Sequence, residues 1–185
     1  LMLRATELAG DVVHIPHVLY KWRAHRGSTA QSLDAKPLAS QAGVRAVTDA
    51  CARRGTPATV QFETRTGHYR VQYEITDPAP LVSIVIPTHD SAEVLRSCVE
   101  SIRSKTTYPR YELILVDNRS TQSAAVDYLQ HLEQEGVRVL RDDRYFNFAR
   151  LCNQGVAAAK GEIVVLLNND TTVVSPGWLE AMASL

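Results

Sequence analysis

The sequence lacks the features that mark several large classes of protein. Its 20 basic residues balance 20 acidic ones, so no whole-chain field recruits nucleic acid or anionic lipid. The three cysteines, Cys51, Cys98 and Cys152, are odd in number and far apart, which fits reduced core thiols in the cytosol better than a disulfide framework. No Cys-x-x-Cys or His-x-x-x-His spacing supports structural zinc, and no apolar run approaches the roughly 20 residues that cross a bilayer. Composition therefore does not indicate a binding partner, and partners must be inferred from local clusters of residues.

What the sequence does contain is a set of three apolar runs that each stop at polar, mostly acidic residues. They are SIVIPTHD (83–90), ELILVDN (112–118) and EIVVLLNND (162–170). Short β-branched and Leu-rich runs closed in this way are typical of buried parallel strands whose carboxyl ends open into a crevice. Helical patterns alternate with strand patterns downstream of Pro80, which predicts an α/β fold with a parallel sheet and right-handed crossovers.

Two glycine motifs that accompany the commonest parallel sheets are missing. A dinucleotide-binding sheet needs a Gly-x-Gly-x-x-Gly turn after its first strand, yet the segment PTHDSAEV (87–94) has no glycine. No Gly-x-x-x-x-Gly-Lys occurs either, so a P-loop is absent. These absences exclude the two main rival functions of such a sheet.

The clearest boundary in the chain lies near residue 78. Asp77, Pro78 and Pro80 break an alternating segment just before the first apolar run. Upstream, residues 37–54 have the apolar spacing of a helix. Two alternating stretches, 59–64 and 68–75, predict a hairpin with one exposed face.

Helix starts in the second part are predicted from capping residues. Asp90 with Glu93 resembles a capping box, Ser120 can cap the next helix, and Asn147 can cap the third. The acidic pair 142–143 lies among arginines and is predicted to be a solvated loop.

The chemistry is expected where the strands end, because the carboxyl ends of parallel strands meet at one crevice. Asp117 is placed to accept a hydrogen bond from a base or ribose, and backbone groups around Thr88 can frame a nucleotide. Asp170, the one carboxylate in its Asn-Asn-Asp triplet, is the best candidate to hold Mg²⁺ or Mn²⁺ against a diphosphate. A metal-bridged diphosphate is a good leaving group, so the strand ends predict transfer chemistry.

Several linked motifs between residues 81 and 185 carry a family resemblance. The segments VSIVIPTHDS, YELILVDNRS, FNFARLCNQGVAAAKGE and IVVLLNNDTTVVSPGWLEAM occur in that order. Together they resemble the Rossmann-like, nucleotide-binding half of an A-type family 2 glycosyltransferase, of the kind that builds bacterial polysaccharide or O-antigen, including rhamnosyltransferase-like members.

This resemblance implies an inverting, metal-assisted transfer from a UDP- or dTDP-sugar to a glycan or lipid-linked acceptor. It also implies a cytoplasmic location, peripheral at the inner face of the membrane. Asp170 would be the metal residue, with Mg²⁺ or Mn²⁺ as cofactor. The nucleotide-binding residues would be Pro87, Thr88, His89, Asp90, Asp117, Asn118, Asn153, Asn168 and Asn169.

Two departures from the family pattern concern the site. Cys152 stands where an Arg often precedes the Asn of the third helix, so a phosphate contact is either missing or supplied by Arg150. No general base for the acceptor hydroxyl can be assigned among these residues, and the family's acceptor half is expected beyond them.

The N-terminal residues add a second resemblance. The chain opens without a secretory signal, and residues 7–30 resemble the closing stretch of another copy of the same fold, with His25 as a second-site candidate. We therefore expect a fragment of a tandem two-transferase protein. Its parts would be the tail of one domain (1–35), a helix-and-hairpin connector (36–77) and the front half of the next domain (78–185), and its truncated core favours self-association.

Two other functions are compatible with the same residues. One is a non-catalytic module that binds a nucleotide or carbohydrate within a larger polysaccharide-synthesis protein. The other is an interaction domain whose sheet is only structural. For single residues, Asp90 and Asp117 can also be simple helix caps or loop carboxylates.

Overall fold

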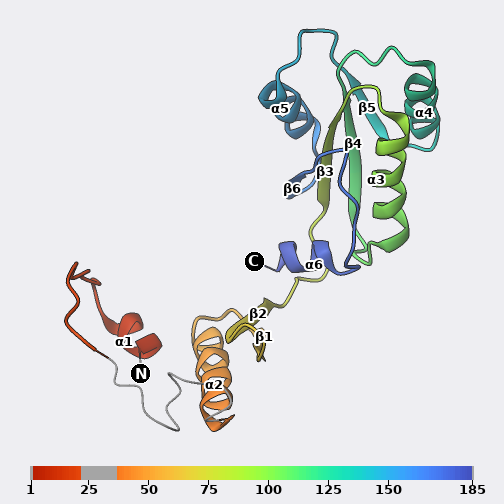
Figure 1. Cartoon of the computed structure of the whole chain (residues 1–185). Helices are drawn as coiled ribbons and strands as arrows, with labels where there is room; N and C mark the ends of the chain where they lie inside the picture. The colour runs from red at the N-terminus through yellow and green to blue at the C-terminus, as the bar shows by residue number, and fades with distance from the viewer. Residues whose placement is uncertain (1, 22–36, 185) are drawn as a thin grey trace. The chain divides into compact units, whose positions relative to one another are not determined.

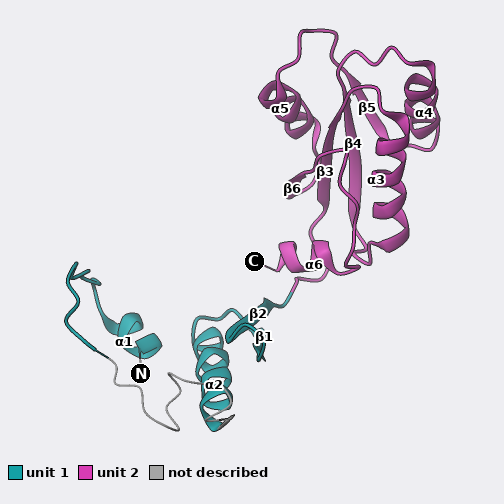
Figure 2. Cartoon of the chain, in the orientation of Figure 1, with its two compact units in different colours: residues 1–74 teal, residues 75–185 magenta. Residues whose placement is uncertain are grey.

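The computed structural model describes residues 2–21 and 37–184, which fall into two compact units. The first unit covers residues 1–74 and the second covers residues 75–185 (Figure 2). His25, the predicted second-site residue, lies outside the described residues. Among the helices that the structure describes, none has both the length and the hydropathy of a membrane span.

The first unit consists of two helices and a hairpin. Helix α1 (Met2–Leu8) is followed in the described chain by α2 (Pro37–Arg53) and by strands β1 (Ala58–Glu63) and β2 (His68–Tyr73). The strands pair antiparallel. The predicted helix over 37–54 and the predicted hairpin are therefore present.

The second unit is built on a four-stranded parallel sheet with the order β5-β4-β3-β6. Its strands are β3 (Val82–Thr88), β4 (Tyr111–Asp117), β5 (Arg138–Arg141) and β6 (Ile163–Leu166). Strands β3 and β4 come from two of the three apolar runs and are buried along most of their length. The predicted parallel α/β fold is confirmed.

Helices cover both faces of this sheet (Figure 1). Helices α3 (Ala92–Lys105) and α4 (Ser123–Gln134) pack on the face to which Ile84 and Ile86 point. Helix α5 (Phe148–Ala158) packs on the other face, against Val85. The side chains of a strand alternate between the two faces of a sheet, so β3 contributes side chains to the hydrophobic core on each face. The short helix α6 (Trp178–Ala183) joins the first core through Leu179.

The cysteines are core residues, as predicted. Cys51, Cys98 and Cys152 are all buried free thiols. Burial raises the pKa of Cys98 to about 11 and also raises the pKa of Cys152. Neither thiol is activated as a nucleophile.

The capping predictions are only partly right. Asn147 does cap α5, accepting a hydrogen bond from the backbone N–H of Arg150. Asp90 does not cap α3, whose N-cap residue is Ser91 and makes no side-chain cap bond. Ser120 does not cap α4 either, because that helix begins after Gln122. Both side chains instead hold the loops at the carboxyl end of the sheet.

The sheet and α5 approach closely at Gly155. A β-carbon added to Gly155 would lie 2.2 Å from Val85 Cγ1 and 3.2 Å from Val116 Cγ2. Both contacts are shorter than ordinary van der Waals separations, so only glycine lets the helix pack at this depth.

We expect Gly155→Val to destabilise the second unit by about 1–3 kcal/mol through overpacking. Gly and Val differ little in helix propensity, so the loss of unfolding free energy reports mainly the overpacking between α5 and the sheet. The matched control is Ala157→Val on the exposed side of the same helix, which should cost about 0.5 kcal/mol. Urea unfolding followed by circular dichroism measures both, and equal losses in the two variants would contradict the packing argument.

Candidate functional site

A pocket lies at the carboxyl ends of β3 and β6, where the chain reverses its direction across the sheet. After β3 the chain proceeds through β4 to β5, and it then returns to place β6 on the other side of β3. Open parallel sheets bind ligands at such a switch point. The pocket has a volume of about 330 Å³ and is lined by Pro87, Thr88, His89, Ser91, Asn118, Phe146, Phe148, Leu151, Asn168 and Asn169.

Six of these lining residues were predicted from the sequence to bind a nucleotide: Pro87, Thr88, His89, Asn118, Asn168 and Asn169. Asp90, Asp117, Asn153 and Asp170 do not line the pocket. The strand ends therefore converge as expected, but not all of their polar side chains face one cavity.

The end of β6 is tied to the end of β3. Strand β6 pairs with β3 as far as Leu166, opposite Val85. The backbone N–H of Leu167 still donates to the carbonyl oxygen of Val85, and residues 168–170 then leave the sheet. Asn169 Nδ2 donates to the hydroxyl oxygen of buried Thr88 over 3.2 Å. This bond sets the two asparagines beside the first strand end.

His89 and Asp90 join the loops that follow β3 and β4. His89 Nδ1 lies 2.7 Å from the carbonyl oxygen of Asn118, and the side chain is 60% exposed. Asp90 Oδ1 accepts hydrogen bonds from the backbone N–H groups of Thr121 and Gln122, at 2.8 and 2.9 Å. These bonds, chiefly that from Gln122, lower the pKa of Asp90. Asp90 therefore holds the turn into α4.

Asp117 is buried and already engaged within the protein. Its Oδ2 accepts a hydrogen bond from Arg141 at 3.1 Å, and its Oδ1 accepts from the backbone N–H and the hydroxyl of Ser120. The Ser120 oxygen in turn accepts from the backbone N–H of Asp90 at 2.7 Å. Asp117 thus connects the ends of three strands through Ser120 and Arg141.

The structure corrects the prediction of a solvated loop at Asp142. Its side chain is 0% exposed and pairs with Arg144 Nη2 at 2.7 Å and Arg150 Nε at 3.1 Å. The hydrogen bonds from Arg144 are the main cause of a pKa held far below the usual value of an aspartate, against the opposing effect of burial. Because Asp142 directly follows β5, the strand-end rule applied to this fourth strand would have identified it.

Asn118 and Arg150 hold the same loop from two sides. Asn118 Nδ2 donates to the carbonyl oxygens of Asp142 and Arg144, each at 2.9 Å. Arg150 Nη2 donates to the carbonyl oxygen of Tyr145 at 2.5 Å. Arg150, predicted as a substitute phosphate ligand, is thus already paired within the protein.

Aromatic residues that the sequence analysis did not single out lie beside the pocket. Phe146 lines it together with His89, and Tyr145 and Phe146 line a neighbouring hollow of about 530 Å³ with His89, Asn118, Arg119 and Thr121. The available signal was the cluster Tyr145-Phe146-Asn147-Phe148, which runs into the first residue of a helix.

Asp170 is exposed, and none of the residues that the structure describes makes a hydrogen bond or ion pair with its carboxylate. Within residues 2–21 and 37–184 no group of three His, Cys, Asp or Glu side chains could hold a metal by itself. A site with one carboxylate still suits Mg²⁺ or Mn²⁺, because such cations take much of their coordination from water and substrate phosphates. Asn153, also exposed, lies on α5.

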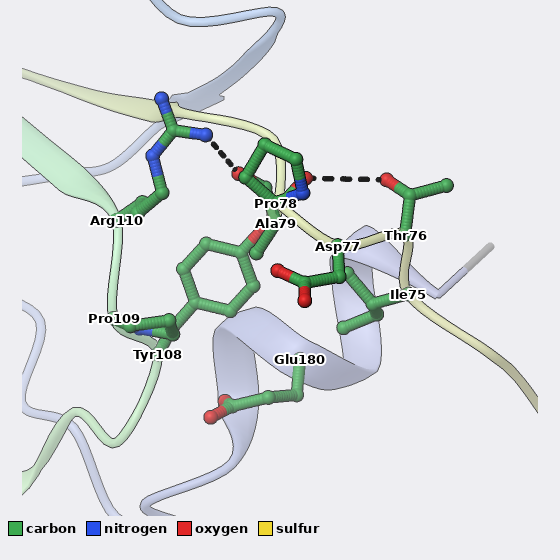
Figure 3. Close-up of a pocket in the computed structure, with 9 residues that line it drawn as sticks. All are labelled: Ile75, Thr76, Asp77, Pro78, Ala79, Tyr108, Pro109, Arg110 and Glu180. Carbon is green, nitrogen blue, oxygen red and sulfur yellow. Dashed lines mark hydrogen bonds between the residues drawn. The ribbon is translucent and has the colours of Figure 1, made fainter.

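A second cavity lies at the opposite end of the sheet (Figure 3). It measures about 460 Å³ and is lined by residues that precede β3 and β4, with Glu180 of α6. Tyr108 donates its hydroxyl to the carbonyl oxygen of Pro80, and Arg110 donates to that of Ala79. None of the predicted site residues lines this cavity.

The family described as "Glycosyl transferase family 2" matches residues 83–185. This span contains every predicted nucleotide-binding and metal residue.

Two relatives align along the whole chain. "Uncharacterized protein y4gI" of Sinorhizobium fredii is 43% identical over 190 residues, which cover 100% of this chain and 21% of that protein. "O-antigen biosynthesis protein RfbC" of Myxococcus xanthus is 35% identical over 184 residues, which cover 100% of this chain and 14% of that protein. The chain therefore spans about a fifth or less of the length of these relatives.

Among solved structures, part of this chain is similar to mannosyltransferase PcManGT from Pyrobaculum calidifontis in complex with GDP-Man and Mn²⁺. The TM-score is 0.51 at 21% sequence identity, and the match covers 57% of this chain and 32% of that chain. This likeness supports the predicted A-type glycosyltransferase fold.

We expect Asp142→Asn to lower the free energy of unfolding at pH 7, because the variant loses a buried anion that pairs with two arginines. The folded-state pKa of Asp142 is depressed, so its contribution is fully present above about pH 4 and is lost as pH falls toward the folded-state pKa. The difference from the unsubstituted chain should therefore shrink below about pH 4.

Urea unfolding at pH 7, 5, 4 and 3 measures this difference. Asp143→Asn is the matched control, because Asp143 is the exposed neighbour, and it should change stability by less than about 0.5 kcal/mol. A difference between Asp142→Asn and the unsubstituted chain that stays constant from pH 7 to pH 3 would show that Asp142 does not stabilise the fold as an anion.

Proposed function

The chain belongs to glycosyl transferase family 2, and we propose that it forms the donor side of an enzyme that transfers a sugar from a nucleoside-diphosphate sugar. The observation that carries this proposal is the pocket at the switch point of the sheet. Thr88, His89, Asn118 and the pair 168–169 line it, and the unpaired carboxylate of Asp170 follows directly in the chain.

The residues divide into two roles under this proposal. Asp90, Asp117 and Asn118 hold the loops of the pocket through bonds within the protein. Asn168, Asn169 and Thr88 offer polar groups to the nucleotide, and Asp170 offers a ligand to Mg²⁺ or Mn²⁺. A bound divalent cation would neutralise the charge that develops on the leaving diphosphate.

Two of the similar proteins support the substrate classes. PcManGT is described in complex with GDP-Man and Mn²⁺, which favours a nucleotide-sugar donor and a metal. RfbC is described as an O-antigen biosynthesis protein, which favours a bacterial glycan as the acceptor. A lipid-linked acceptor, a location at the inner face of the membrane, an inverting mechanism and a UDP- or dTDP-sugar remain our predictions from the family resemblance.

A second candidate function follows because the described residues offer no assignable general base. An acid–base group is needed to take the proton of the acceptor hydroxyl, and none can be assigned among residues 2–21 and 37–184. A module that binds the nucleotide without turnover is compatible with this observation. Release of nucleoside diphosphate from a donor in the presence of acceptor separates the two functions, because the module binds the donor and releases none.

We expect the chain to bind a nucleoside diphosphate more tightly with Mn²⁺ than without it. Isothermal titration calorimetry with UDP, dTDP, GDP and ADP, each with Mn²⁺ and with EDTA, measures the difference. Asp170→Asn keeps the size of the side chain but removes its charge, so it should abolish most of the Mn²⁺ enhancement.

The matched control is Asp127→Asn, which removes an exposed carboxylate from the middle of α4 and should leave binding unchanged. Failure of all four nucleotides to bind under either condition would reject the donor site. Binding whose Mn²⁺ dependence survives Asp170→Asn would reject Asp170 as the metal residue.

A further inference from the structure

Two aromatic rings stand in solvent beside the pocket although their backbone is firmly held. Tyr145 is 86% exposed and Phe146 is 72% exposed. They lie in the loop of residues 142–147, which joins β5 to α5 across the carboxyl end of the sheet (Figure 1). Arg119 lies over the Tyr145 ring, with its Cζ 5.7 Å from the ring centroid, but most of the surface of both rings stays exposed, so its burial requires another molecule.

The loop is preorganised by contacts on both sides of the rings. Asp142 at its start is buried and pairs with Arg144 and Arg150. Asn118 donates to the carbonyl oxygens of Asp142 and Arg144, and Arg150 donates to that of Tyr145. A loop fixed before binding loses less conformational entropy when a ligand arrives.

The rings face polar groups of the loops after β3 and β4. Tyr145 and Phe146 line the 530 Å³ hollow with His89, Asn118 and Thr121. Phe146 also lines the 330 Å³ pocket, which contains Asn168 and Asn169. A ligand that suits both spaces therefore needs a flat part beside the rings and a polar part beside the end of β6.

A nucleoside diphosphate has this division between a flat base and an anionic diphosphate. A base stacks on an aromatic ring with little regard to its identity, because every base has a π face. Both rings line the 530 Å³ hollow, whose lining does not include Asn168, Asn169 or Asp170, whereas the diphosphate is expected beside those residues. The flat part is therefore the base rather than the sugar.

We propose that Tyr145 and Phe146 form a stacking wall for the donor nucleobase, and that Asp142 is the positioning residue that holds this wall in place. The proposal rests on the proposed function for the identity of its ligand. It assigns recognition of the base to the loop after β5, and metal binding to the segment after β6.

Calorimetry on the full chain tests the wall with the nucleoside diphosphate that binds best among UDP, dTDP, GDP and ADP. Phe146→Ala and Tyr145→Ala should each weaken its binding by about 5- to 100-fold. Phe146→Tyr keeps a ring and should retain affinity. The ratio of affinities with and without Mn²⁺ should stay unchanged, because stacking does not involve the metal. Tyr20→Ala, which removes another exposed ring, is the control.

A double-mutant cycle tests Asp142. Asp142→Asn should weaken nucleotide binding in the unsubstituted chain, and it should cost nothing further once both rings are removed. A role in stability alone would lower binding by the same factor in both backgrounds, and that result would reject Asp142 as a positioning residue.

The possible failures are distinguishable. Absence of nucleotide binding by the unsubstituted chain overturns both the proposed function and the wall. Binding that depends on Asp170 but is unchanged by Phe146→Ala and Tyr145→Ala overturns the wall alone. A loss seen with nucleotide sugars but not with nucleoside diphosphates would place the rings against the sugar and overturn the assignment to the base.

Discussion

A carboxylate that is buried at the end of a strand must be paired, and the arrangement of this site depends on how buried Asp117 and Asp142, together with partly exposed Asp90, are paired. Asp117 pairs with Arg141 and Ser120, and Asp142 pairs with Arg144 and Arg150. Asp90 accepts two backbone N–H groups ahead of α4. The bonds from Ser120 and Arg144 close their own loops. Those from Arg141, Arg150 and the backbone before α4 tie one strand-end loop to another element. The three aspartates therefore build a hydrogen-bonded rim, whereas Asp170 and Asp143, both exposed, make no hydrogen bond or ion pair with any described residue.

The rim explains why the pocket combines two kinds of surface. On the side of β6, Asn168 and Asn169 line the pocket with polar side chains, and exposed Asp170 follows them in the chain. On the side of β5, the loop held by Asp142 presents Tyr145 and Phe146. A nucleotide sugar needs both surfaces, because its base is flat and its diphosphate is charged. The parallel order β5-β4-β3-β6 places both surfaces at the same end of the sheet.

The sheet, its order of elements and the place of the pocket could be predicted because they follow from local patterns. The runs at 83–90 and 112–118 are long, apolar and closed by polar residues, so their strand ends were identified correctly. The partners of the aspartates could not be predicted in this way. Asp90 has a capping-box pattern nearby in sequence, but its carboxylate bonds backbone groups 31 and 32 residues away. Asp142 seemed solvated among alternating charges, since its burial depends on Arg150, which reaches it only once α5 has formed. The exposed rings of Tyr145 and Phe146 gave no periodic signal at all.

The central claim, that the carboxyl end of this sheet binds a nucleoside diphosphate with a metal at Asp170, can be tested most directly by paramagnetic broadening. Mn²⁺ broadens the amide NMR signals of nearby residues. We expect Mn²⁺ added with a bound nucleoside diphosphate to broaden the signals of residues 168–171 and 88–89 first, and the broadening at low Mn²⁺ to require the nucleotide. Broadening centred on another part of the chain, or the same broadening without nucleotide, would contradict the claim.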